Sequence, residues 1–273
     1  MRKFPLENRI FSGEIGRVFK TGTEQGFGPN TMDLNFLENY RDSRPFDSMI
    51  STFDDRSMGM TSVVAHLKSL FKCDIHSLST PCDSLSSHYF DSIISGQTQI
   101  NKLIISRGSI SAESLTKVFD KIEVITCLEV YANCAAVQSF RFTAKSLLIG
   151  NSFWVNFDHL KLMTECVVIH LNGSTLTNQN VTAFLEKWES GKFSNLQYLN
   201  LEILNRSEDF DVLGFSPLRS VHLTFKPRLF EKEVLGEIRK VYGARDYERN
   251  GQVVAKVGYY VSPKIKTLQI LVL

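Results

Sequence analysis

The 273-residue sequence has almost no net charge and no long apolar run, and each of these shortages excludes a class of protein. Its 31 basic and 29 acidic residues leave a net charge of +2, too little for a surface that binds nucleic acid or an anionic membrane. No stretch reaches the roughly 20 apolar residues that a membrane-spanning helix needs, and the N-terminus has no signal-peptide core. We therefore predict a cytoplasmic or nuclear protein that binds neither nucleic acid nor membrane.

The sequence also offers little that would hold a metal or catalyse a reaction. Its five cysteines are an odd number and thinly spread, which is typical of reduced thiols rather than of a disulfide framework. Four residues of zinc-binding types do lie near one another, with gaps of two, five and five residues that match no common zinc motif. They are Cys73, His76, Cys82 and His88. Because no nucleophile elbow, phosphate loop or dinucleotide fingerprint occurs either, we predict a protein that is not an enzyme and has no cofactor.

What the sequence does contain is a recurring apolar pattern. Apolar residues at positions i, i+3 and i+5 form the core of a leucine-rich repeat. The first residues of successive copies are 25, 19, 22, 30, 22 and 47 positions apart, so the last interval must hold an insertion. The copies are Ile100/Leu103/Ile105, Ile125/Leu128/Val130, Ala144/Leu147/Ile149, Cys166/Ile169/Leu171, Leu196/Leu199/Leu201, Leu218/Val221/Leu223 and Ile265/Leu268/Ile270. We predict that each triplet lies on one strand and points into the core.

One segment of the chain also matches another without a gap. Residues 100–121, shifted by 66 positions, lie on residues 166–187, so that Ser111 meets Thr177. The match runs through a strand, a turn and a helix, and it places a hydroxyl where it can cap the helix in both copies. The whole strand–helix unit therefore repeats. Because such units are joined by right-handed crossovers, we expect the repeat strands to be parallel.

Periodicity and end signals predict the other elements. Helices are expected over residues 60–71, 153–163 and 177–190. The acidic start and basic end of residues 231–240 suit a helix dipole and predict a further helix there. Asn250-Gly251, between two alternating runs, predicts a β-hairpin.

Together these patterns predict an α/β fold. We expect an irregular leucine-rich-repeat-like solenoid of parallel strands alternating with helices, with a C-terminal β-hairpin. Residues 1–50 are rich in turn formers and charges and keep no steady period, so they are expected to form an irregular N-terminal segment. Residues 51–273 are expected to form the repeat domain.

The strand positions that point away from the core would form the binding face of such a solenoid. Their mixture of aromatic and polar groups suits protein recognition, although an ordinary sheet surface would have the same composition. The candidates are Lys102, Glu129, Tyr131, His170, Gln197, Tyr198, Asn200, Glu202, Arg219 and His222. Ile104, Leu148, Val167 and Val168 also point outward in this register. That is too apolar for a wet face, so we expect another element, such as the N-terminal segment, or a partner to cover part of it.

A family resemblance is carried by the middle of the chain. Trp188, Ser190 and Gly191 form a W-x-S-G pattern, and an L-x-Y-L pattern follows at residues 196–199. From Phe153 to Leu199 the sequence resembles the type 2 F-box-associated domain of nematode F-box proteins. Residues 62–75 and 246–259 also resemble the regions that precede and close this domain.

The resemblance implies a non-enzymatic protein-interaction module, similar to the substrate-recognition part of SCF-type ubiquitin-ligase receptors. Its implied partners are a protein target and, through an F-box, the SCF adaptor. Phe4-Pro5-Leu6 is similar to the opening of an F-box, but residues 7–50 lack the pattern of three amphipathic helices. We therefore expect the F-box to be missing or highly divergent. The alternative is a stand-alone binding module, or a degenerate paralogue without a ligase role.

Overall fold

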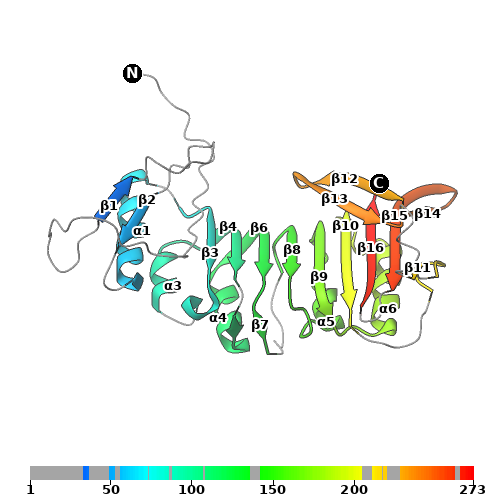
Figure 1. Ribbon diagram of the computed structural model, residues 1–273, viewed down its shortest axis with the longest axis horizontal. Helices are drawn as coiled ribbons and strands as arrows, with labels where there is room; N and C mark the ends of the chain where they lie inside the picture. The colour runs from blue at the N-terminus through cyan, green and yellow to red at the C-terminus, as the bar shows by residue number, and fades with distance from the viewer. Residues whose placement is uncertain are drawn as a thin grey trace, which may run out of the picture.

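The structure is a computed structural model of the chain (Figure 1). It describes residues 33–36, 49–52, 56–72, 74–85, 88–106, 108–135, 142–204, 211–216, 218–219, 228–261 and 265–273. The region in which an F-box was sought, residues 1–32 and most of 37–55, lies outside this set, as do Cys73 and His222. The expectation of a missing or divergent F-box therefore stays a prediction.

A single mixed sheet of ten strands organises the described residues, in the order β11-β15-β16-β10-β9-β8-β6-β4-β3, with β14 paired to β15. Six neighbouring strands are parallel and follow one another in sequence order (Figure 1). They are β3 (Ser77–Thr80), β4 (Gln99–Ile105), β6 (Glu123–Val130), β8 (Ser146–Ile149), β9 (Val168–Ser174) and β10 (Tyr198–Ile203). The predicted α/β class and the parallel repeat strands are confirmed for this part of the sheet.

The C-terminal part of the sheet changes direction. β16 (Lys266–Val272) runs antiparallel to β10, and β15 (Gln252–Val261) runs antiparallel to β16. β14 (Arg245–Arg249) and β11 (Leu218–Arg219) pair with β15. The expected hairpin at Asn250-Gly251 is confirmed as the β14–β15 turn, in which both residues have positive φ. The copy at residues 265–270 is a buried strand, but it runs against the parallel set.

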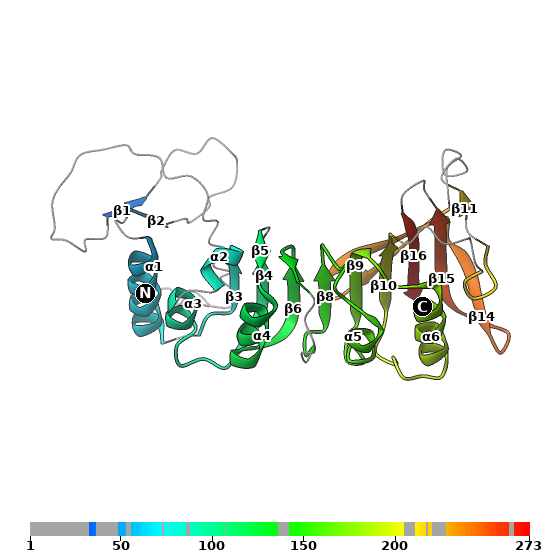
Figure 2. The same cartoon turned by 90° about the horizontal axis from the view of Figure 1, so that it is seen from below.

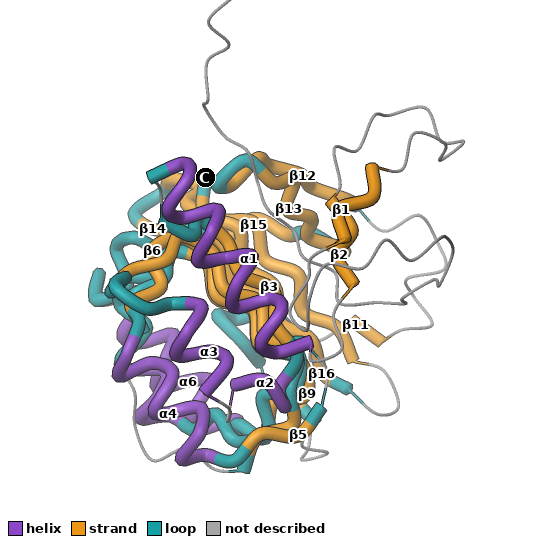
Figure 3. The backbone as a smooth tube through the Cα atoms, turned by 90° about the vertical axis from the view of Figure 1, so that its left-hand side faces the viewer, coloured by secondary structure: helices purple, strands orange, loops and turns teal. Residues whose placement is uncertain are grey.

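Helices lie on one face of the sheet (Figure 2 and Figure 3). They are α2 (Cys82–Leu85), α3 (His88–Ile93), α4 (Ala112–Lys121), α5 (Phe157–Lys161) and α6 (Asn178–Glu189), while α1 (Arg56–Phe71) packs against α3 near the N-terminal end of the sheet. Short strand pairs complete the described structure: β1 (Asp33–Phe36) with β2 (Met49–Thr52), and β5 (Ser109–Ile110) with β7 (Asn133–Cys134). β1 lies within the segment that was predicted to be irregular.

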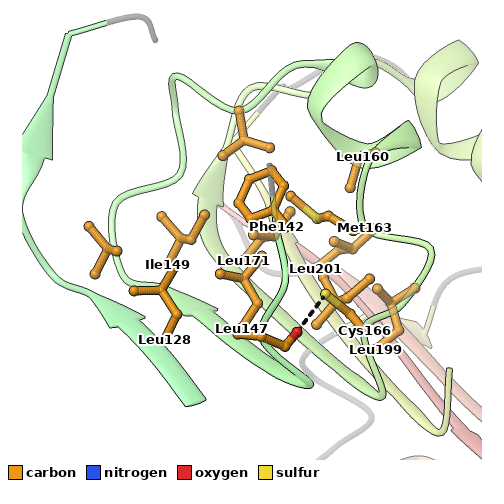
Figure 4. Close-up of a cluster of buried hydrophobic side chains, with 14 of the residues drawn as sticks. Leu128, Phe142, Leu147, Ile149, Leu160, Met163, Cys166, Leu171, Leu199 and Leu201 are labelled. Carbon is orange, nitrogen blue, oxygen red and sulfur yellow. Dashed lines mark hydrogen bonds between the residues drawn. The ribbon is translucent and has the colours of Figure 1, made fainter. Parts of the chain in front are cut away.

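The core lies between the parallel strands and the helices. The predicted triplets on β4, β8, β9 and β10 are all buried, and Figure 4 shows Leu147, Ile149, Leu171, Leu199 and Leu201 converging beneath α5. Burial of each such side chain contributes roughly 1.5–3 kcal/mol of hydrophobic free energy. One triplet is shifted: Val124 is buried in place of Ile125, because a bulge between β4 and β6 adds one residue to β6.

Both predicted helix caps are confirmed. The Ser111 hydroxyl accepts a hydrogen bond from the backbone N–H of Ser114 at the start of α4. The Thr177 hydroxyl accepts one from the N–H of Asn180 at the start of α6, and the Asn180 side chain bonds back to the Thr177 N–H. These contacts satisfy amide groups that have no partner within the helix.

Two predicted helices are wrong or shorter than expected. α5 covers only residues 157–161, so Phe153 and Trp154 precede it; Phe153 is 45% exposed and Trp154 is buried. Residues 231–240 form no helix but two strands, β12 (Leu229–Val234) and β13 (Glu237–Tyr242), joined at Leu235 and Gly236. Side chains of alternate residues face the sheet, and this two-residue period outweighs the charge order that suited a helix dipole. The helical period of residues 60–71 places Leu70 on the same face as Val63, yet in α1 Val63 is buried and Leu70 is exposed.

Candidate protein-binding face

The side of the sheet opposite the helices carries two aligned rows of side chains. Cross-strand register places the first row at Lys102, Cys127, Ser146, Val168, Tyr198 and Leu271. The second row holds Ile104, Glu129, Leu148, His170, Asn200 and Gln269. These are the outward positions of the sequence pattern, because successive side chains of a strand alternate between the two faces.

The β12–β13 hairpin covers one end of these rows (Figure 1, orange). Its inner residues Val234 and Val241 are buried in a cluster with Val168, Tyr198 and Leu271 of the sheet. This second small core explains why Val168 is apolar although it points away from the helices. The expectation that another element covers part of the apolar outward positions is confirmed for Val167 and Val168, and the covering element is this hairpin, while Ile104 and Leu148 lie outside its cover.

Polar contacts fix the hairpin in place. The Gln269 side chain donates to Asn200 Oδ1 at 3.1 Å and accepts from the backbone N–H of Tyr242 at 3.1 Å. Lys232 Nζ donates to the carbonyl of Val272 at 2.8 Å. Gly258 lies directly under the carbonyl oxygen of Tyr242, where a Cβ atom would collide with the hairpin backbone. Hydrogen bonds and a close backbone approach therefore hold the hairpin to β15 and β16.

The hairpin corrects part of the predicted binding face. Tyr198 is 5% exposed, with Arg239 over its ring, and Asn200 is 4% exposed. Both were expected to be accessible because alternation along β10 points them outward. They do point away from the helices, but the hairpin covers them. In this structure Tyr198 packs against the hairpin, and Asn200 bonds to Gln269, which in turn bonds to the hairpin.

The remaining candidates have different surroundings. Glu129, Tyr131 and His170 are half-buried on the uncovered part of the sheet. Gln197 is exposed just before β10, and Glu202 is half-buried near its end. Arg219 lies on β11, apart from the first group, and His222 is outside the described residues. We define the open face as the accessible group on β4, β6, β8 and β9. It consists of Lys102, Ile104, Glu129, Tyr131, Leu148 and His170.

Glu129 is the polar centre of the open face. Its carboxylate accepts from Lys102 Nζ at 2.9 Å and from the Tyr131 hydroxyl at 2.9 Å. Burial opposes ionisation of Glu129, but these hydrogen bonds and the charge of Lys102 outweigh it and lower the pKa of Glu129. Burial and the same carboxylate raise the pKa of Tyr131 to about 12. The charges of Lys102 and Glu129 therefore cancel each other within the open face.

Tyr131 is held in position by the neighbouring strand. Its ring lies where a side chain on Gly150 would stand, since a Cβ atom there would come within 2.8 Å of the ring. Asn151 also donates to the carbonyl of Tyr131 at 3.2 Å. The ring and its hydroxyl are thus oriented before any partner arrives, which lowers the entropy that binding would lose.

The tip of the hairpin borders the open face. Arg239 of β13 pairs with Glu237 at 2.6 Å, and its charge reaches His170 on β9. Burial lowers the pKa of His170, and Arg239 lowers it further, against a hydrogen bond with Asn172. The imidazole is therefore neutral at neutral pH. Sequence reasoning missed Glu237 and Arg239 as neighbours of this face, because residues 231–240 were predicted to form a helix.

A cysteine thiol, that of Cys127, also lies on this side of the sheet, next to the open face. Burial and the Glu129 charge raise the pKa of this thiol to about 11. A thiol with such a pKa is not activated for attack. In the described ranges, no group of three His, Cys, Asp or Glu side chains gathers to hold a metal. Of the zinc candidates, His76 instead contacts Asn101, and Cys82 donates to the carbonyl of Ser106.

The W-x-S-G pattern has a packing role on the opposite side of the molecule. Trp188 is 6% exposed and lies between Tyr247, with ring centroids 5.7 Å apart, and the Arg249 guanidinium at 5.4 Å. The Tyr247 hydroxyl donates to Glu189. Gly191, with a φ of +85°, ends α6 as a left-handed residue. These residues join α6 to β14.

Comparison with known proteins gives a family match for the middle of the chain. Residues 135–201 match the family described as F-box associated. A Caenorhabditis elegans protein, the Skn-1 dependent zygotic transcript 15 protein, is 39% identical over 62 residues, which cover 23% of this chain. The match spans 18% of that protein's length. No solved structure matches the chain. The F-box-associated resemblance is therefore confirmed for the segment that runs from before β8 to β10.

Among the described residues, no helix is long and apolar enough to cross a membrane.

The Glu129 network predicts a pH-dependent stability. Because its folded pKa is lowered, Glu129 contributes stability above its unfolded pKa of about 4.3, and this is lost as pH falls through the folded value. We expect Glu129→Gln to cost about 2 kcal/mol at pH 7 and progressively less below about pH 4. Urea unfolding across this pH range measures the difference. Glu113→Gln, which breaks the exposed Glu113–Lys117 pair, is the control and should have a much smaller effect. A cost for Glu129→Gln that does not change with pH would contradict the assignment.

The hairpin contact predicts an unusual sensitivity at Gly258. A methyl group there meets the backbone of Tyr242, so Gly258→Ala must displace the hairpin and should cost about 1–3 kcal/mol. Hydrogen exchange of the Tyr242 amide, which bonds to Gln269, should become faster in the same variant. Val253→Ala, at an exposed position of the same strand, should leave that exchange rate unchanged. Unaltered protection of Tyr242 in Gly258→Ala would show that the hairpin does not rest on β15.

Proposed function

We propose that this chain is a non-enzymatic protein-interaction module that binds a protein target through its open face. The observation that carries the proposal is the F-box-associated match at residues 135–201, which covers β8, β9 and most of β10, the last three strands of the parallel set. That family is associated with substrate recognition by F-box proteins of SCF-type ubiquitin ligases. The finer proposal is that this chain supplies the substrate-recognition part of such a receptor.

The composition of the open face supports a protein target. Its charged groups are already paired: Lys102 with Glu129, and at its border Arg239 with Glu237. Ile104 and Leu148 are half-buried apolar groups on the strands either side of Glu129, and Tyr131 is a fixed aromatic group. A mixed surface of this kind, without an excess of either charge, is typical of protein interfaces. Tyrosine is also one of the residues that most often carry binding energy.

We further propose that the strand–helix units form an irregular leucine-rich-repeat-like solenoid. Support comes from the order of the parallel strands, which follows the sequence from β3 to β10. The buried triplets recur on successive strands, and the caps of α4 and α6 occupy equivalent positions. In a solenoid each unit contacts mainly its neighbours, so the sheet presents one continuous surface to a partner.

A second candidate is a binding module without a ligase role, either stand-alone or a degenerate paralogue. It is favoured by the sequence of residues 7–50, which lacks the pattern of three amphipathic F-box helices. The two candidates share the open face and differ only in adaptor docking. Co-purification of the SCF adaptor and cullin separates them.

The proposal is tested by affinity purification followed by mass spectrometry. We expect Tyr131→Ala with His170→Ala to weaken capture of the target about tenfold or more, because both side chains lie on the open face. If the chain acts as a ligase receptor, the same variant should retain adaptor and cullin. Lys117→Ala with Lys161→Ala, on the helical side, is the matched control and should capture the target normally. Circular dichroism checks that both variants are folded.

Equal capture by the open-face variant and the helical-side control would contradict the proposed binding face. Loss of adaptor and cullin from the wild-type sample, with the target retained, would assign the chain to the second candidate.

A further inference from the structure

The outer face of the β12–β13 hairpin carries an unusual concentration of exposed apolar side chains. The described residues include ten exposed large hydrophobic side chains, and four of them lie on this 14-residue hairpin. They are Leu229, Leu235, Ile238 and Tyr242, exposed by 47%, 45%, 57% and 42%. The inner face of the hairpin is already packed on the sheet through Val234 and Val241. The ribbon therefore carries apolar side chains on both faces, and those of its outer face lack a cover within the described chain.

The turn adds to this pattern. Leu235 has a φ of +53° and Gly236 a φ of +78°, the left-handed pair of a two-residue hairpin turn. Asn or Gly would fit the first position with less strain, since a bulky side chain is disfavoured at positive φ. The leucine instead places another exposed apolar group at the tip of the ribbon.

The order of residues along the outer face is self-complementary. Cross-strand register pairs Leu229 with Tyr242 near the base and Glu231 with Lys240 in the middle. Glu231 and Lys240 form an ion pair of 2.9 Å, with about half of each side chain exposed. Glu233 and Ile238 follow toward the tip. Glu231 of β12 and Lys240 of β13 are thus direct cross-strand neighbours of opposite charge.

We propose that a second copy of this chain covers the ribbon, with the two hairpins packed face to face about a two-fold axis that runs along the ribbon. This axis places β12 of one copy over β13 of the other. Leu229 then meets Tyr242 of the partner subunit, and Glu231 meets the partner's Lys240. The four charges form a closed ring of alternating sign. An axis across the ribbon would instead put Glu231 over the partner's Glu231, and like charges would oppose that arrangement.

The size of the ribbon sets the expected strength of the dimer. Six residues per strand make a ribbon about 20 Å long and about 10 Å wide. This footprint is smaller than that of a standard interface, which buries about 800 Å² on each partner. We therefore expect a weak dimer that forms with rising protein concentration. The open face lies on the sheet beside the hairpin, so the dimer does not depend on the proposed function.

Sedimentation equilibrium with charge-reversed variants tests the proposal. The wild-type chain should dimerise with rising concentration. Glu231→Lys and Lys240→Glu, each alone, should weaken the dimer tenfold or more, because like charges then face one another. A 1:1 mixture of the two variants should dimerise again, since each supplies the charge that the other lacks. Disruption of folding by either change would not be repaired by mixing.

The Glu113–Lys117 pair on α4 provides the matched control, because it is also an exposed ion pair. Glu113→Lys and Lys117→Glu should leave the dimer unchanged. The proposal is overturned if the wild-type chain stays monomeric at every concentration, if the single variants at Glu231 and Lys240 dimerise like wild type, or if their mixture does not associate. A monomeric chain that captures a different protein through Ile238 and Tyr242 would assign the ribbon to that protein instead of a second copy.

Discussion

The parallel sheet has two faces, and helices cover only one of them. On that face the recurring triplets, such as Ile169 and Leu171 of β9, are fully buried. The side chains of the second face must therefore be either covered by another element or polar and paired. At one end the β12–β13 hairpin covers Val168 and Tyr198. Toward β4 the surface is instead balanced by the Lys102–Glu129 ion pair. The hairpin thus covers the apolar end of the second face, and the ion pair lies on the end that stays open.

Features set by local periodicity could be predicted from the sequence. The triplets on β4, β8, β9 and β10, the caps Ser111 and Thr177, and the Asn250-Gly251 turn depend on residues close together in the chain. The bulge at Val124 escaped prediction, because Val124 and Ile125 are both apolar and only the neighbouring strand decides which of them is buried. Local pattern thus predicts which positions are apolar more reliably than it predicts register.

Features that depend on distant segments were missed. Residues 231–240 have charges suited to a helix dipole, yet contacts with Val168, Tyr198 and Leu271 favour two strands. The same contacts bury Tyr198 and Asn200, which alternation alone would expose. Eight of the ten predicted face residues are described with their side-chain surroundings, and two of these eight, Tyr198 and Asn200, are buried. Glu129, Tyr131 and His170 do remain on the open face.

The family match and the open face overlap only partly. Residues 135–201 include Leu148 and His170 of that face, while Lys102, Ile104, Glu129 and Tyr131 precede the match. Within the match, Trp188 and Gly191 connect α6 to β14 and fix the scaffold. The matched segment therefore accounts for architecture more than for the chemistry of recognition. The identity of a target would depend on the side chains of β4 and β6.

The central claim is that a protein target contacts the open face. A photo-cross-linking residue placed at Leu148, in the middle of that face, tests it most directly. Our account predicts a covalent adduct with a discrete protein from this position, and none from the same cross-linker at Lys161 on the helical side. Adducts from Lys161, with none from Leu148, would contradict it.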